Sequence, residues 1–199
     1  MPLPRSFYQR PVLTVARDCV GKLLLHRTVE GLVGGRIVET EAYRGPDDLA
    51  AHSSKGRTPR TEAMFGPPGH AYMFLLYGMH WAFNIVVGEV GEPHAVLVRA
   101  VEPTVGLPFM AQRRGMDASR RELTNGPGKL CAAMNLTREH YGMDLCGAHL
   151  FLEEGPHPVS RRRIGRSARI NVDYAGAWAH KPWRFYERGN PYVSVPPRD

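Results

Sequence analysis

Apolar and β-branched residues alternate with polar ones over several short runs of the chain, which is the pattern of strands that bury one face. The clearest run is 33–41, where Ile37, Glu39 and Glu41 share one face. Turns rich in glycine or proline separate the runs. Strands are therefore predicted at 23–25, 33–41, 71–76, 81–87, 95–102 and 149–153.

Three other segments have the apolar spacing and end signals of helices. Thr14 is a candidate N-cap for a helix over 15–20 that Gly21 ends. The other two helices are predicted at 107–114 and 127–134, the second of which has proline in its first turn.

The strand over 33–41 brings two carboxylates towards its end, with Tyr43 one step ahead of them. A carboxylate on a partly apolar face, just before the Gly45-Pro46 break, is well placed for proton chemistry. The commoner fate of such residues is to face solvent from a half-buried strand. Spacing alone does not separate Glu39 from Glu41.

The strands over 71–76 and 81–87 are rich in aromatic residues and are joined by Tyr77-Gly-Met-His80, with Gly78 supplying the turn. A large ring at the tip of a hairpin is a candidate wedge between DNA bases. The alternative is that the aromatic residues are simply core. Tyr77 and His80 fit that alternative least well, because buried residues rarely sit on a glycine turn.

The roles of two polar residues, His52 and Arg99, depend on the side chains that surround them in the fold. His52 is at the centre of the long polar segment 45–61, which we interpret as a functional loop, although most loop histidines are merely solvated. Arg99 is alone within the apolar strand 95–102. If buried, it needs a carboxylate such as Glu41 or Glu39; at a sheet edge its guanidinium would reach water instead.

The composition is that of one soluble globular domain. The chain has 199 residues, 43% of them hydrophobic, and three scattered cysteines without a CxxC pair, which indicates a reducing compartment and a fold that needs no disulfide. No apolar run reaches the roughly 18 residues of a membrane span, and no signal peptide is expected. We expect a single domain over 1–199 with flexible ends at 1–11 and 196–199.

The net charge of +7 and the pI near 9.6 favour a polyanionic partner, with nucleic acid as the leading candidate. The segment 157–170 holds five arginines and no acid, which predicts a phosphate-facing surface, although a solvated face is the usual fate of a charge run. Gly126-Pro-Gly-Lys129 lacks the spacing of a nucleotide phosphate loop, yet Lys129 could hold one DNA phosphate.

Other chemistries find little support. No serine lies in a GxSxG elbow, and the nine histidines show no HExxH or similar ligand spacing, so no metal site is expected. What remains is a carboxylate, a stacking ring, a loop histidine, an aromatic hairpin and a basic surface. This combination suits an enzyme that pulls a base out of DNA and directs water at its sugar.

Several motifs of mixed composition occur in one order along the chain, from about residue 12 to residue 195. They are Gly35-Arg-Ile-Val-Glu-Thr-Glu-Ala-Tyr43, Ala50-Ala-His-Ser53, Thr58-Pro-Arg60, Tyr77-Gly-Met79, Asn84-Ile85, Leu97-Val-Arg-Ala100, Gly126-Pro127 with Lys129-Leu-Cys131, and Lys181-Pro182 with Arg184-Phe-Tyr186. In these strings the sequence resembles the alkyladenine (3-methyladenine) DNA glycosylase family.

The resemblance implies a role for each matching residue. Glu41 would be the general base, with Arg99 and the Ile170 carbonyl positioning the water. Tyr43 and His52 would stand on the two faces of the flipped base, Asn84 would discourage guanine, and Tyr77 would enter the minor groove. Phe74 stands where animal members have a second stacking tyrosine, and His80 also replaces an expected tyrosine. DNA-backbone contacts are predicted for Lys129, Arg161, Arg162 and Arg163.

The implied fold is α+β: a single mixed domain with a curved, mostly antiparallel β-sheet, flanking helices and a protruding β-hairpin. The resemblance implies a monomer that acts on double-stranded DNA containing damaged purines, without cofactor, metal or membrane. It would be cytoplasmic, on the nucleoid, in a bacterium and nuclear in a eukaryote. Two alternatives stay open, a non-catalytic binder of distorted DNA or structured RNA and an RNA-directed hydrolase.

Overall fold

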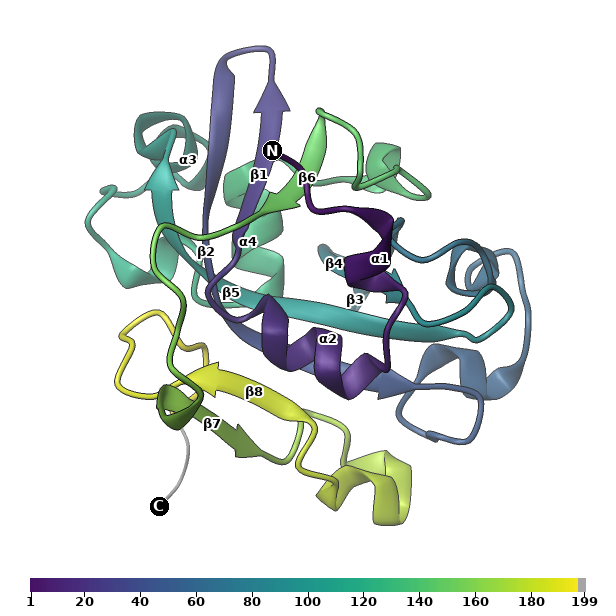
Figure 1. Cartoon of the computed structure of the whole chain (residues 1–199). Coiled ribbons are helices and arrows are strands. Elements are labelled where there is room, and N and C mark those ends of the chain that lie inside the picture. The colour runs from purple at the N-terminus through teal and green to yellow at the C-terminus, as the bar shows by residue number, and fades with distance from the viewer. Residues whose placement is uncertain (197–199) are drawn as a thin grey trace.

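The computed structural model describes residues 1–196 and confirms the α+β prediction (Figure 1). The strands are β1 (Leu23–Thr28), β2 (Gly31–Arg44), β3 (Ala71–Leu76), β4 (His80–Val87), β5 (His94–Val105), β6 (Leu150–Glu153), β7 (Ile164–Ser167) and β8 (Arg184–Glu187). The α-helices are α1 (Arg5–Tyr8), α2 (Val12–Cys19), α3 (Leu107–Arg114) and α4 (Pro127–Met134). The 3-10 helices are η1 (His52–Lys55), η2 (Glu62–Phe65), η3 (Arg121–Leu123), η4 (Arg138–His140), η5 (Arg161–Arg163) and η6 (Asp173–His180).

All strand pairs of the sheet are antiparallel, and β2 is its organising strand. The order is β3-β4-β5-β2-β1-β6. One edge of β2 pairs with β5 along most of its length, whereas the other edge pairs first with β1 and then with β8. Three register shifts against β5 bend β2, as bulges do. A side chain on Gly34 would overlap the Leu24 carbonyl oxygen, so glycine permits the close approach of β1 there.

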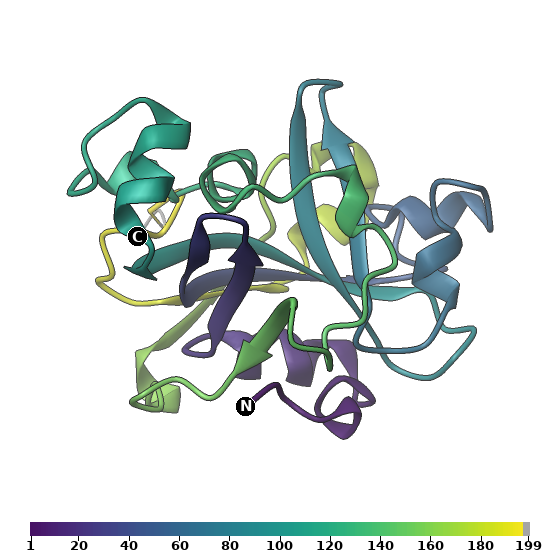
Figure 2. The same ribbon diagram turned by 90° about the horizontal axis from the view of Figure 1, so that it is seen from above.

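Helices cover both faces of the sheet. Figure 2 shows α2 on one side and α3 with α4 on the other. The helix predicted at 15–20 begins earlier, at Val12, because Pro11 occupies the N-cap position and Val12 adds a buried turn to the apolar face. The predictions for α3 and α4 are confirmed. Within residues 1–196, no helix combines the length and hydrophobicity that crossing a membrane requires.

The N-terminal segment is packed, in contrast to the prediction of a flexible end at 1–11. Leu3 and Tyr8 are buried in the core, and the backbone N–H of Leu3 donates to the Leu152 carbonyl at 2.7 Å. The segment 1–11 is therefore packed against the domain. At the other end, residues 197–199 of the predicted flexible segment lie outside the described residues.

The hairpin of β3 and β4 projects from the body of the domain, as predicted (Figure 2). Its turn uses left-handed backbone at two successive residues, Tyr77 (φ 51°) and Gly78 (φ 71°). Two such residues give the tight turn whose twist matches antiparallel strands. Positive φ is unfavourable for tyrosine, so the hairpin holds Tyr77 in a strained conformation at its tip.

Candidate functional site

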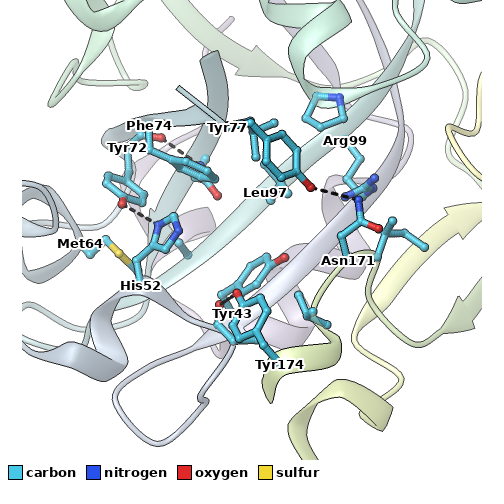
Figure 3. A pocket seen from close by; sticks show the side chains of 17 residues that line it. Tyr43, His52, Met64, Tyr72, Phe74, Tyr77, Leu97, Arg99, Asn171 and Tyr174 are labelled. Carbon is cyan, nitrogen blue, oxygen red and sulfur yellow. Dashed lines mark hydrogen bonds between the residues drawn. The ribbon is translucent and has the colours of Figure 1, made fainter. Parts of the chain in front are cut away.

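A cavity of about 240 Å³ opens at the base of the hairpin, where β2, β4 and β5 meet the segment that follows β7. Figure 3 shows Tyr43 and Tyr174 on one side of it and His52 with Phe74 on the opposite side. The walls are largely aromatic. A cavity with these walls suits a flat, apolar-faced ligand such as a nucleobase.

Glu41 lies beneath the cavity floor and is fully buried. Its carboxylate accepts hydrogen bonds from the Tyr43 hydroxyl at 2.7 Å and from the Ile170 backbone N–H at 2.7 Å, and Arg99 Nη1 is 3.3 Å away. Ile170 contacts Glu41 through its N–H, and the water-positioning role that the resemblance implies for its carbonyl stays a prediction. All three partners line the cavity. The carboxylate is thus held immediately below the space that a ligand would occupy.

Glu39 is equally buried but faces a different environment. It accepts from Arg99 Nε at 3.0 Å and from Arg184 Nε at 2.7 Å, and Ser194 donates through both its N–H and its hydroxyl. The alternative of two solvent-facing glutamates is therefore wrong, and Arg99 is buried with both carboxylates as partners. Glu39 has its acceptor positions filled by protein, whereas Glu41 adjoins the cavity.

The Tyr43 ring is held in place by a cation–π contact with Arg169. The guanidinium of Arg169 lies 4.7 Å from the ring centroid and is itself paired with Asp48. Burial and the charge of Glu41 raise the pKa of Tyr43 well above its usual range, so the phenol stays protonated and can donate to Glu41. The contact with Arg169 and the hydrogen bond to Glu41 therefore fix the orientation of the Tyr43 ring at the cavity.

The opposite wall consists of His52, Tyr72 and Phe74. The His52 ring is edge-on to Phe74 with centroids 4.4 Å apart, and its Nδ1 is 2.9 Å from the Tyr72 hydroxyl. Burial, together with the nearby charges of Arg60 and Lys55, lowers the pKa of His52 to about 4. The imidazole is consequently neutral near pH 7, where it adds no positive charge to the cavity.

Asn84 lies at the floor of the cavity and Tyr77 lies at its mouth. Asn84 on β4 is buried and donates through its amide to the Tyr72 carbonyl at 3.2 Å, which orients it at the cavity. The Tyr77 side chain is 76% exposed, and its hydroxyl is 3.5 Å from Asn171 Nδ2. The structure thus brings the predicted catalytic and base-binding residues and Tyr77 around one cavity.

The predicted backbone-contacting residues are not all brought together. Lys129 is in the first turn of α4, whose Pro127 lines the cavity, and its ammonium donates to Asn125 Oδ1 at 2.9 Å. Arg161, Arg162 and Arg163 form η5 and do not line the cavity. Figure 2 shows the light green segment that carries η5 far from the tip of the hairpin.

The arginines of segment 157–170 are also less available for phosphate contacts than the sequence suggests. Arg169 is buried with Asp48, and Arg163 pairs with Glu187 at 3.1 Å. The segment contains no acid, but the fold supplies acids from elsewhere in the chain. The prediction of a five-arginine phosphate surface is therefore wrong for Arg169.

Sequence reasoning missed several residues of the site. Asn171, with φ 58°, and Tyr174, 71% exposed, both lie at the cavity. Arg184 and Asp48 complete the ion pairs beneath it. Only Arg184 carried a signal, as part of the Arg184-Phe-Tyr186 motif.

Comparison with known proteins places the chain among DNA repair sequences. The family model described as Methylpurine-DNA glycosylase (MPG) matches residues 6–191. A protein of Methanocella arvoryzae is 49% identical over 96% of this chain and 95% of its own length. One from Myxococcus xanthus is 50% identical over 98% and 94%, and one from Bacillus cytotoxicus is 48% identical over 98% and 100%. Each of the three is named "Putative 3-methyladenine DNA glycosylase".

Neutralising Glu39 should destabilise the fold. In Glu39→Gln, Arg99 would keep Glu41 as its carboxylate partner, whereas Arg184 would lose the carboxylate that pairs with it, and removing one partner of a buried ion pair costs about 3–5 kcal/mol. We expect a clearly lower free energy of unfolding in urea. The control is Glu62→Gln, which breaks an exposed pair with Arg57 and should leave the unfolding midpoint nearly unchanged. Equal midpoints for both variants would contradict the inferred role of Glu39.

His52 should make stability depend on pH. Between about pH 6.5 and pH 4 the unfolded chain protonates His52 while the folded protein keeps it neutral, so the unfolded state binds more protons and stability falls as the pH falls. His52→Gln removes this contribution. We expect the Tm of the variant to fall less than that of the parent between pH 7 and pH 5. His157→Gln, at an exposed loop position, should follow the parent; a His52→Gln curve that does the same would disprove the assignment.

Proposed function

The chain belongs to the methylpurine-DNA glycosylase family, and on this premise we propose that it hydrolyses the N-glycosidic bond of alkylated purines in duplex DNA, 3-methyladenine among them. The observation that carries the proposal is the position of Glu41. It lies beneath an aromatic-walled cavity and is held by Tyr43, Ile170 and Arg99. A fixed carboxylate at this place can activate water against a sugar carbon.

The carboxylate has room for one more partner. A carboxylate accepts roughly four hydrogen bonds, and three donors lie around Glu41. The remaining position is taken by the attacking water. Glu41 removes a proton from the water while the water oxygen forms a bond to C1′ of the sugar. The bond from C1′ to the base nitrogen breaks, and its electron pair leaves with the base. The negative charge of Glu41 also stabilises the oxocarbenium-like transition state.

The aromatic walls select the base. A flipped purine would lie with one face on Tyr43 and the other towards His52 and Phe74. Alkylation at a ring nitrogen makes the purine cationic, which strengthens its attraction to aromatic faces and makes it a better leaving group. Since Phe74 has no hydroxyl, its contribution is stacking alone. Asn84, oriented by its bond to Tyr72, would crowd the exocyclic amine of guanine.

Base flipping leaves a gap in the duplex that the enzyme must fill. Tyr77 is the residue for this role, because its ring is exposed at the tip of the hairpin and directly beside the cavity. Lys129, at the start of α4 on the same side, can hold a phosphate of the strand. Because η5 lies far from the hairpin tip, Arg161, Arg162 and Arg163 would meet only DNA that extends beyond this site (Figure 2).

The reaction is tested by incubating the protein with duplexes that carry 3-methyladenine, 7-methylguanine, ethenoadenine or hypoxanthine and measuring free base by chromatography. We expect release of at least 3-methyladenine, which is cationic in the duplex and lacks the exocyclic 2-amino group of guanine. Glu41→Gln should lower the single-turnover rate by about 10²–10⁴-fold, because Gln cannot accept the proton, while lesion binding persists.

The control for this experiment is Glu62→Gln, an exposed position that should retain the full rate. Absence of release from all four duplexes would refute the proposed reaction. Binding to lesions without release would favour the alternative, a non-catalytic reader of distorted DNA.

Replacing Tyr77 tests the wedge. The ring is exposed, and alanine has the same disadvantage at positive φ as tyrosine. Tyr77→Ala should therefore leave Tm within a few degrees of the parent. Affinity for a lesion-containing duplex should fall by about tenfold or more, since stacking is worth about 1–3 kcal/mol per base. Fluorescence anisotropy with matched lesion and undamaged duplexes measures this. Val90→Ala, which truncates an exposed side chain that does not line the cavity, is the control and should bind as the parent does. A steep loss of Tm in Tyr77→Ala would show that the ring is structural.

A further inference from the structure

Three histidines from distant parts of the sequence meet beside the C-terminal end of α4. His26 is on β1, His140 ends η4, and His149 directly precedes β6. One ring nitrogen from each lies within 4.8 Å of the others. His26 and His140 are buried, whereas His149 is exposed. The cluster is therefore preformed and open to solvent on one side.

Hydrogen bonds already orient the two buried rings. His26 Nδ1–H donates to the Met134 carbonyl at 2.7 Å, so His26 Nε2 presents its lone pair to the cluster. His140 Nε2 is 3.0 Å from that atom. A backbone carbonyl that holds the outer N–H of a histidine is the usual support of a metal-binding imidazole. The Met134 carbonyl supplies this support for His26.

We propose that His26, His140 and His149 form a binding site for a divalent transition-metal ion of the Zn²⁺ class. Three imidazoles suit Zn²⁺, Co²⁺ or Ni²⁺ and do not suit Mg²⁺ or Ca²⁺, which prefer oxygen ligands. Tetrahedral Zn²⁺ at about 2.0–2.1 Å from each nitrogen places the nitrogens roughly 3.3 Å apart. The present 3.0 Å between His26 and His140 is close to this spacing. Water would complete the coordination on the exposed side.

Binding requires one proton to move within His140. The Thr137 N–H now donates to His140 Nδ1 at 3.1 Å, so the proton is on Nε2. In the other tautomer Nδ1–H donates to the Thr137 carbonyl, 3.3 Å away, and the Thr137 N–H loses its bond to Nδ1. The change of tautomer frees the Nε2 lone pair for the metal without net release of a proton.

A bound ion would join three elements at the back of the cavity wall. The residue after His140, Tyr141, accepts from the Ala63 N–H at 2.9 Å and packs edge-on against Tyr72. Tyr72 in turn contacts His52. The metal would therefore stabilise the fold from β1 to the wall of the cavity while taking no part in the chemistry at Glu41.

Metal binding is measured on the full chain after dialysis against EDTA, without DNA, so its outcome is independent of the glycosylase assay. We expect isothermal titration with ZnCl₂ to give one site per chain. At a hundredfold excess over Kd, Tm should rise by roughly 5–10 °C, with no rise in MgCl₂. Co²⁺ should give the visible absorption of a four-coordinate site.

The decisive variant is His149→Ala, because this side chain is exposed and its removal should not impair folding. It should weaken Zn²⁺ affinity by about tenfold or more, which at the same Zn²⁺ concentration should reduce the Tm shift to roughly half or less. His157→Ala, which removes an exposed histidine outside the cluster, should bind as the parent does. Absence of binding by the parent, or undiminished binding by His149→Ala, would overturn the proposal.

Discussion

Two arginines and two glutamates are buried together below the cavity, and each charge is tolerable there only because the others compensate it. Arg99 from β5 and Arg184 from β8 converge on Glu39 of β2, and Ser194 fills its remaining acceptor positions. The same Arg99 reaches Glu41. The network therefore ties three strands and the C-terminal segment together and holds one carboxylate at the cavity floor.

The site combines this rigid floor with a rim of turns. Glu41, Asn84 and Arg99 stand on paired strands, so their positions follow from the register of the sheet. Tyr77 and Asn171 stand on turns with left-handed backbone and contact each other across the mouth. Reacting groups gain from fixed geometry, whereas residues that enter a duplex must be accessible, and the two parts of the fold divide these tasks.

Local patterns were sufficient for much of the architecture. The presence of β2 and the aromatic hairpin followed from period-two spacing, and α3 and α4 followed from their end signals. The expectation that β2 buries one face only was wrong, because its residues 37–42 are all buried. The helix α2 was misplaced by a turn because Pro11, not Thr14, marks its start. The histidine cluster escaped notice because His26 and His140 are 114 residues apart, and ligand motifs describe only residues that one element brings together.

By itself the sequence determined six of the eight strands, the hairpin with its exposed Tyr77 and, through its collinear motifs, the family; it did not predict β7 and β8. Only the tertiary structure decided which charges are free. It distinguished the two glutamates, because Glu39 pairs with Arg99 and Arg184 whereas Glu41 adjoins the cavity. It also buried Arg169 against Asp48. The physical reason is that local spacing sets which face a side chain occupies, whereas burial and charge compensation depend on partners that folding brings from remote positions.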